Sequence, residues 1–524
     1  MYSSLDSLEA DVLNNIEQAN FGLALDLIIQ FVQYVIRDPK TTAVIFGSER
    51  LDRLCLAIGN AMVKKERTPI ARDVKTENSE SHVVTLATHL ERYGGHTLVM
   101  EDVIRAQPEK SHIILLIDLF NLADLESLTE RLSPIAEFRV APRRSILEKM
   151  EWLLDQLEAI TPDRIILFNH HEDAVAIASM QPWVGSAQII FYHHADHALC
   201  LGVHLPEVIH IDPHNMGYDN CKAHEALRSN RYLPLAVPDR GCRPTDLEFL
   251  QNGIVRTCSS GTSHKFHQPY SCVYSELISK MLAQHGGVHF HIGNLSDDQL
   301  DTIRLHLKRE GVDTFRFVHI PWVSSLWSAL IENRIDLYIS SFPLGGGRAT
   351  IEAMGSGTPL LMHESYLSRF HGGVDLAFPR AFVWRNPTEF FKHITSLDLN
   401  TLRDHSRQAR QHYETNHLPE VMASELNYIC SGEGSLIPPQ IKSYVPDDLQ
   451  KYLHVNATET SLLAERNERI SSLNRAVAER DSQIVSINQA VIERDAALHA
   501  IRLSHSWRLT APLRFLRRIL HNNR

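Results

Sequence analysis

The chain has 524 residues, of which 44% are hydrophobic and 22% are charged, with 24 glycines and 23 prolines. This balance is typical of globular proteins and excludes collagen-like, disordered and disulfide-scaffold classes. Because the net charge is −11, we do not expect non-specific nucleic-acid binding to be its main function. The seven scattered cysteines contain no CxxC pair, which favours a reducing compartment and argues against a disulfide framework or a structural zinc site.

Residues 1–75 are expected to form a helical region that contributes packing and no chemistry. Its apolar residues, among them Ala24, Ile28 and Phe31, recur at helical spacing. The N-terminus contains acids and lacks a basic segment followed by an apolar run, so no signal peptide is expected. No run of about 18 apolar residues occurs, so no transmembrane helix is expected.

From about residue 80, short apolar runs alternate with helical stretches, which predicts parallel sheets covered on both faces. Strands are expected at residues 82–86, 113–117, 164–168, 188–192 and 208–211, and then at 254–259, 289–293, 314–318, 337–340, 359–362 and 381–383. We therefore expect an α/β protein with two tandem Rossmann-like domains over 76–235 and 251–430. The proline-containing segment 232–246 is the expected linker between them.

Residues 456–502, which follow a second Gly- and Pro-containing linker at 431–455, are expected to form a coiled coil. Apolar residues recur every seven positions, at Leu463, Ile470, Val477, Ile484, Val491 and Leu498. The second seam position alternates between aliphatic residues and arginines: Arg466, Leu473, Arg480, Ile487, Arg494 and Ile501. A single amphipathic helix that packs on its own domain is the alternative.

The C-terminal tail, residues 503–524, is basic and amphipathic. The last 23 residues contain six arginines and no acid, interspersed with apolar residues such as Trp507, Leu513 and Phe515. Such a segment suits an anionic membrane surface or an acidic partner.

The strongest chemical signal is the segment SSFPLGGGRATIE at 340–352, in which a strand leads through a glycine turn into a helix. The glycines allow close backbone approach, and the N–H groups at the helix start suit a diphosphate. The expected phosphate-binding residues are Gly346, Gly347, Arg348, Ala349 and Thr350, and Glu352 is the expected ribose ligand. The segment is neither a P-loop nor a GxGxxG fingerprint. A purely structural turn is the alternative.

Lys265 lies in the loop CSSGTSHKF at 258–266, after the first strand of the second domain. There it can contact phosphates as a point charge. The alternative is a solvated surface lysine.

Histidines supply the candidate catalytic residues. In the turn Gly94-Gly95-His96-Thr97, a neutral His96 can take a proton from an acceptor hydroxyl, or it can simply pack against its helix. His194 and His197, in the segment FYHHADH at 191–197, are the further candidates. An acceptor or phosphate contact is favoured there over a metal site, because no distant Cys or Glu completes a ligand set. We interpret residues 170–173 and 212–214 as structural.

With these motifs in view, residues 80–430 resemble GT-B glycosyltransferases, most closely the O-linked N-acetylglucosamine transferase group and the cytosolic bacterial adhesin N-glucosyltransferases. The family's phosphate turn and acidic ribose ligand match residues 346–352, its phosphate-contacting lysine matches Lys265, and its active-site histidine matches His96. Its His-Pro or Tyr-Pro loop, before a strand that ends in Asp, matches residues 192–212. The family's helical-repeat arm is not evident. The C-terminal coil resembles tails of bacterial surface-polysaccharide enzymes.

The resemblance implies transfer of a hexosyl or N-acetylhexosaminyl group from a nucleotide-diphosphate sugar, with donor on the second domain and acceptor on the first. Retaining GT-B enzymes carry two glutamates eight apart, and the first of these positions is Leu344, which favours inversion. We expect a metal-independent reaction without a cofactor, in a cytoplasmic homo-oligomer that is peripheral on the inner membrane face. The expected acceptor is a bacterial surface glycan, with a protein acceptor as the alternative. A nucleotide-sugar epimerase and a non-catalytic scaffold are the rival functions.

Overall fold

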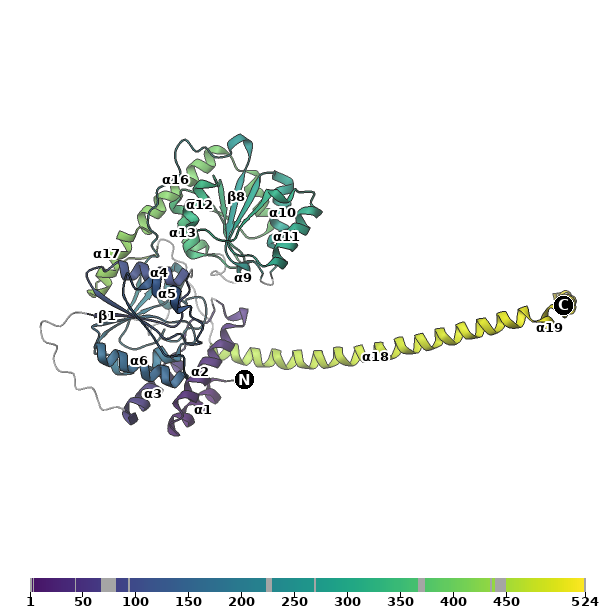
Figure 1. Ribbon diagram of the computed structural model, residues 1–524, viewed down its shortest axis with the longest axis horizontal. Coiled ribbons are helices and arrows are strands. Elements are labelled where there is room, and N and C mark those ends of the chain that lie inside the picture. The colour runs from purple at the N-terminus through teal and green to yellow at the C-terminus, as the bar shows by residue number, and fades with distance from the viewer. Residues whose placement is uncertain are drawn as a thin grey trace. The chain divides into compact units, whose positions relative to one another are not determined.

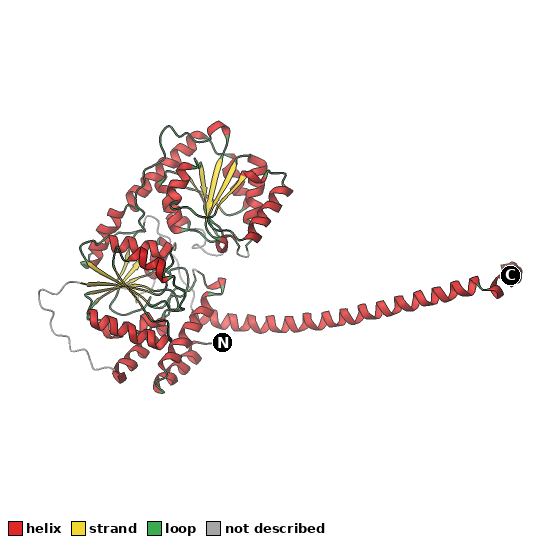
Figure 2. Ribbon diagram, in the orientation of Figure 1, coloured by secondary structure: helices red, strands yellow, loops and turns green. Residues whose placement is uncertain are grey.

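The computed structural model describes residues 2, 4–42, 44–66, 82–92, 95–222, 229–267, 270–365, 373–433, 436–438 and 449–522. The chain divides into two compact units, residues 1–450 and 451–524, which are described separately. Both sheets belong to the first unit, and helices cover both faces of each sheet (Figures 1 and 2).

Three helices open the first unit, as expected for this region: α1 (Leu5–Glu17), α2 (Phe21–Ile36) and α3 (Glu49–Glu66). The side chain of Ser4 caps α1 by accepting a hydrogen bond from the Ser7 N–H. Asp52 on α3 accepts hydrogen bonds from the backbone N–H groups of Gly202 and His204, at 2.7 and 2.8 Å. Helix α3 is therefore joined to the first sheet domain by a buried carboxylate.

The first sheet has seven parallel strands in the order β3-β2-β1-β4-β5-β6-β7. They are β1 (His82–Ala87), β2 (Ser111–Leu116), β3 (Glu137–Val140), β4 (Arg164–Phe168), β5 (Gln188–Tyr192), β6 (Ile209–Asp212) and β7 (Asn230–Tyr232). The connecting helices are α4 (Gly95–Arg105), α5 (Leu125–Leu132), α6 (Ile146–Ile160), α7 (Ala174–Ala178) and α8 (Asn215–Lys222). The five predicted strands are confirmed, whereas the edge strands β3 and β7 were not predicted.

The second sheet has six parallel strands in the order β10-β9-β8-β11-β12-β13. They are β8 (Arg256–Ser260), β9 (Val288–Ile292), β10 (Phe317–Ile320), β11 (Leu337–Ile339), β12 (Leu360–His363) and β13 (Phe382–Trp384), and all six were predicted within three residues. The helices here are α9 (Ser263–Phe266), α10 (Tyr274–His285), α11 (Asp297–Arg309), α12 (Leu326–Glu332), α13 (Gly347–Gly355), α15 (Pro387–Thr395), α16 (Leu399–Asn416) and α17 (Pro419–Cys430).

The last of these helices returns to the first sheet domain. Asn427 on α17 accepts a hydrogen bond from Gln107 at 2.9 Å, and the Cys430 carbonyl accepts one from Gln188, also at 2.9 Å. Buried apolar residues of both sheets form one continuous core cluster, which includes Ile166 on β4 and Tyr338 on β11. The two sheets are thus packed parts of one unit.

The second unit consists of the 55-residue helix α18 (Leu449–Leu503), followed by α19 (His505–Leu509) and α20 (Ala511–Asn522). The expected linker at 431–455 falls partly outside the described residues, which resume at Leu449 where α18 begins. The long helix agrees with the expected helical segment, but a single chain does not show a coiled coil. Among the described residues, no helix is long and apolar enough to cross a membrane.

Candidate active site

The glycine turn after β11 leads directly into α13, whose N-cap is Gly346 and whose first residue is Gly347. The Thr350 N–H donates to the Gly346 carbonyl at 3.2 Å, so the N–H groups of the three preceding residues have no intrahelical acceptor. A Cβ on Gly346 would lie 2.9 Å from Lys265 Nζ, and one on Gly347 would lie 3.2 Å from His214 Nε2. Because Gly346 and Gly347 have no side chains, the start of the helix is open to an anion, and Lys265 and His214 lie beside it.

Lys265 on α9 reaches this turn from the end of β8. Its Nζ donates to the Gly345 carbonyl at 3.3 Å. Burial lowers the pKa of this ammonium group, and no carboxylate pairs with it in the described part of the chain. The ammonium group is therefore available for a negatively charged ligand at the start of α13.

His214, which follows β6, faces the same turn from the first sheet domain. Its Nδ1 lies 2.7 Å from the Asp196 carboxylate, which orients the ring with Nε2 toward Gly347. A cavity of about 50 Å³ lies between the two domains, lined by His214, Asn215, Met216, Gly345, Gly346, Gly347, Gly373, Asp375 and Leu376. The sequence pattern favours a structural role for residues 212–214, whereas the structure places His214 beside the glycine turn. The position of His214, two residues after a predicted strand, was the signal that could have identified it.

Two of the expected donor ligands are engaged by other protein groups. The Arg348 guanidinium lies 2.5 Å from the Asp102 carboxylate on α4 and 3.7 Å from that of Glu352. The other oxygen of Glu352 accepts a hydrogen bond from the Trp327 N–H at 3.1 Å, at the start of α12. Arg348 and Glu352 therefore connect α13 to neighbouring helices.

The remaining expected ligands, Ala349 and Thr350, lie in the first turn of α13. The Thr350 hydroxyl is buried and donates to the Gly346 carbonyl at 2.8 Å. The Ala349 Cβ lies 3.5 Å from the position that a Cβ on Gly346 would take. These two residues therefore help to fix the backbone conformation of the turn.

Three histidines gather where β1, β4 and β5 end. The ring centroid of His96 lies 4.9 Å from that of His170 and 5.6 Å from that of His194, with the last two rings 5.3 Å apart. His96 Nε2 lies 2.6 Å from the His89 carbonyl. Because a carbonyl only accepts, Nε2 carries the proton and Nδ1 is the acceptor nitrogen.

Burial lowers the pKa of His96 and lowers that of His170 to about 3. These rings are therefore neutral near pH 7, which is the state a general base requires. Both ring nitrogens of His194 are buried without a hydrogen-bond partner in the described structure. His197 lies instead beside His171, with the two Nε2 atoms 3.1 Å apart. Gly94 lies outside the described residues.

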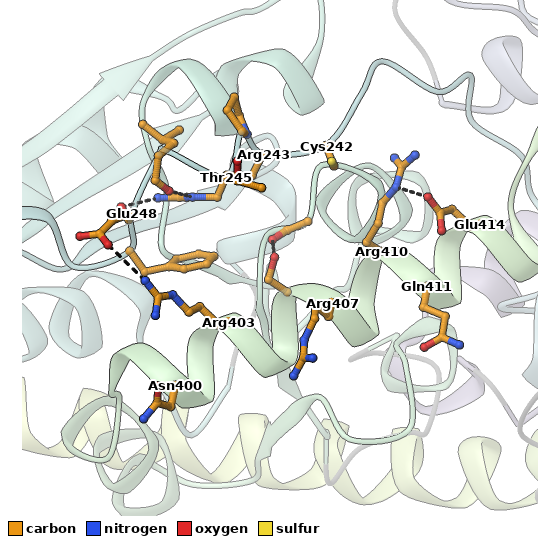
Figure 3. Close-up of a pocket in the computed structure, with 15 residues that line it drawn as sticks. Cys242, Arg243, Thr245, Glu248, Asn400, Arg403, Arg407, Arg410, Gln411 and Glu414 are labelled. Atoms are coloured by element: carbon orange, nitrogen blue, oxygen red, sulfur yellow. Dashed lines mark hydrogen bonds and ion pairs between the residues drawn. The ribbon is translucent and has the colours of Figure 1, made fainter.

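A larger cavity of about 650 Å³ adjoins Gly357, just beyond the C-terminal end of α13, and is lined by several arginines (Figure 3). Arg403 pairs with Glu248 at 3.1 Å and Arg410 with Glu414 at 2.7 Å. Because these charges are balanced and the glycine turn lies at the other end of α13, we do not assign this cavity to the candidate active site.

No family model matches the chain, and no curated protein matches it. Among solved structures, Alr3699/HepE from Anabaena, in complex with UDP and glucose, covers 67% of this chain and 100% of its own, with 12% identity and a TM-score of 0.50. A glycosyltransferase from Rickettsia africae covers 67% and 98%, with 11% identity and a TM-score of 0.51. The lipopolysaccharide outer core galactosyltransferase WaaB covers 67% and 99%, with 13% identity and a TM-score of 0.50. At these identities the likeness shows the fold, and the expected two-domain α/β architecture of GT-B proteins is confirmed.

Proposed function

We propose that this chain transfers a sugar from a nucleotide-diphosphate sugar to an acceptor hydroxyl. The observation that carries the proposal is the Lys265 ammonium group beside the open start of α13. That pairing of a lysine charge with free backbone N–H groups suits a diphosphate. The neighbouring fold of Alr3699/HepE, solved with UDP and glucose, supports a nucleotide sugar as the ligand.

The donor would bind with its diphosphate on the N–H groups of Gly347, Arg348 and Ala349. Lys265 on one side and His214 on the other would contact the phosphate oxygens. Glu352 is 16% exposed, and we assign it a ribose hydroxyl in addition to the Trp327 N–H that it already accepts. The Arg348 side chain would position α13 through Asp102 and would not contact the donor, which meets only the backbone N–H of this residue.

In the proposed reaction, Nδ1 of His96 takes the proton of the acceptor hydroxyl. The acceptor oxygen forms a bond to the anomeric carbon as the bond from that carbon to the phosphate oxygen breaks. The leaving nucleoside diphosphate carries the displaced electron pair and is stabilised by Lys265 and the α13 N–H groups. Because Leu344 stands where a retaining enzyme would carry a glutamate, we propose inversion, and these groups neutralise the diphosphate without a catalytic metal.

We further propose a bacterial surface glycan as acceptor, with a protein acceptor as the alternative. The exposed arginines and apolar residues of α20 support a peripheral location of the enzyme at the cytoplasmic face of a membrane. Exposed aliphatic residues along α18 support a homo-oligomer.

Thermal-shift and calorimetric titration with UDP, GDP, dTDP and CMP sugars tests donor binding. Lys265→Ala and Glu352→Ala should each weaken binding by at least roughly tenfold, about 1.4 kcal/mol, while the exposed Lys280→Ala serves as control. Unchanged affinity in both variants would refute the donor site. Turnover with and without acceptor then separates the rivals: an epimerase converts the donor alone, and a scaffold binds it weakly or not at all.

A further inference from the structure

Four side chains of types that bind metals converge in the interior of the first sheet domain, from the consecutive elements β5, β6 and α8. His193 follows β5, His210 and Asp212 lie on β6, and Cys221 lies on α8; all four are buried. One ligand atom from each residue lies within 4.8 Å of the other three. None of the four residues is among those assigned to the His96 cluster or to the glycine turn.

Four of the six distances between these atoms are close to the edges of a zinc tetrahedron, and the other two are no longer than 4.8 Å. His193 Nδ1 lies 3.0 Å and His210 Nε2 lies 3.4 Å from Asp212 Oδ1. The Cys221 sulfur lies 3.4 Å from His193 Nδ1 and 3.5 Å from Asp212 Oδ1. With zinc bonds of about 2.0–2.1 Å to N or O and about 2.3 Å to S, tetrahedral edges are about 3.3 Å, or about 3.6 Å where sulfur takes part.

The polar side-chain atoms of the four residues have hydrogen-bond partners only within the group, as far as the chain is described. His193 Nε2, His210 Nδ1 and Asp212 Oδ2 are buried with none. A carboxylate, a thiolate and two neutral imidazoles carry two negative charges, which a divalent cation cancels. Charge neutrality is what a fully buried site requires.

We propose that His193, His210, Asp212 and Cys221 bind a structural zinc ion. The mixture of imidazole, thiolate and carboxylate suits zinc better than the oxygen-preferring magnesium or calcium. Four protein ligands leave no position for water, so the site is closed and structural. The ion joins β5, β6 and α8, and so fixes the segments that carry Asp196 and His214 at the glycine turn. This replaces the expectation of no zinc site: the ligands are spread over 29 residues of sequence without a CxxC pair.

The test uses untagged full-length protein, expressed in zinc-containing medium and purified without chelator. Elemental analysis should find about one zinc per chain. Cys221→Ser and His210→Gln should each lower that content at least about fivefold, since each removes one of four ligands. Cys258→Ser, which removes a buried thiol of the second domain, should leave it unchanged.

Cobalt gives a second readout that does not require the variants to fold. Wild-type protein refolded with Co²⁺ should show intense tetrahedral d–d absorption and a thiolate-to-cobalt charge-transfer band. Wild-type protein with neither zinc nor this cobalt spectrum would overturn the proposal and leave a metal-free His–Asp hydrogen-bond network. Full zinc content in folded Cys221→Ser and His210→Gln would overturn it as well, because the ion would then lie elsewhere.

Discussion

Lys265, the proposed phosphate ligand, carries a desolvated charge that we expect to lower the stability of the free protein. Its ammonium group is largely buried, makes one hydrogen bond of 3.3 Å to a carbonyl and has no carboxylate partner in the described structure. We expect Lys265→Met to keep or raise the unfolding temperature of the free protein, because a desolvated charge is removed while the side-chain volume is kept. The same variant should lose the stabilisation by nucleotide sugar. A variant that is less stable alone yet still stabilised by donor would contradict this role.

The pH dependence of donor binding follows from the same group. Burial lowers the Lys265 pKa below its usual value of 10.5, so the ammonium group loses its proton at lower pH in the folded protein than in the unfolded chain. Donor affinity should therefore fall as pH rises toward this lowered pKa, while the free protein gains stability over the same range. Lys265→Arg is the control, since a guanidinium stays charged and should remove the alkaline loss. Calorimetric titration of the wild type and of Lys265→Arg between neutral and alkaline pH measures the two donor affinities.

His96 is the residue expected to act on the acceptor. Its Nδ1 is the acceptor nitrogen of a neutral ring, so His96→Ala should lower kcat by roughly 10²-fold with donor affinity nearly intact. His194→Ala should also lower activity, because that ring stacks on His96, whereas His197→Ala should have a smaller effect. Steady-state kinetics together with donor titration measure both quantities. A collapse of donor affinity without loss of turnover of bound donor would instead make His96 a phosphate ligand.

Helices α4 and α13, which carry His96 and the glycine turn, are held together by the Asp102–Arg348 pair, whose side chains are about 15% exposed. Arg348→Met should destabilise the fold by about 2–4 kcal/mol, because Asp102 is left without its partner. Burial already raises the Asp102 pKa and Arg348 opposes that rise. Without the arginine the pKa rises further, so the stability loss should grow as pH rises above the usual Asp range.

Denaturant unfolding at acid and neutral pH, with Asp102→Asn in a double-mutant cycle, measures this coupling. The double variant should recover most of the loss, because the buried charge is gone. Arg403→Met, which breaks a pair that is more than half exposed, should change stability by at most about 1 kcal/mol. Equal losses in Arg348→Met with and without Asp102→Asn would contradict a direct ion pair.

Most elements were predictable because their signal is local. Buried parallel strands such as β4 read as continuous apolar runs, whereas β3 and β7 are short edge strands with polar residues. The glycine turn and the loop that contains Lys265 could also be identified from the sequence, because each directly follows a predicted strand of the same sheet. The partner of Arg348 lies 246 residues away, and Cys221 meets His193 across 28 residues. Such contacts depend on the packing of α4 and α8, which spacing alone does not specify.

At the scale of the whole molecule, the C-terminal unit presents an apolar seam that the isolated chain leaves uncovered. Ile470, Val477, Ile484, Val491 and Leu498 are between 41% and 56% exposed on α18. A seven-residue apolar repeat of this length is buried by a partner helix in a coiled coil. Arg466, Arg480 and Arg494 replace apolar residues at the second seam position of alternate heptads. Such charged residues favour one specific register between the paired helices over a fully apolar interface.

The tail beyond this helix combines basic and apolar side chains without an acid. In α20, Leu513, Phe515 and Leu516 are 57–68% exposed, and the Arg514 guanidinium lies 3.6 Å from the centre of the Trp507 ring. Each basic residue near an anionic surface contributes about 1 kcal/mol. Full-length protein should therefore sediment with anionic vesicles at low salt, and the bound fraction should fall at high salt and with neutral vesicles.

Removal of residues 457–524 tests both consequences of the C-terminal unit while the buried Leu449 and Leu453 stay in place. The truncated protein should be monomeric by light scattering, should not sediment with vesicles, and should bind nucleotide sugar as the full chain does, because the glycine turn and Lys265 lie in the first unit. A second truncation, after residue 503, keeps α18 and should remain oligomeric without vesicle binding, since it loses only the basic tail. If the shorter protein kept the oligomer order of the full chain, self-association would have to reside in the first unit. If the truncation after residue 503 still sedimented with anionic vesicles, the tail would not be the membrane-binding segment.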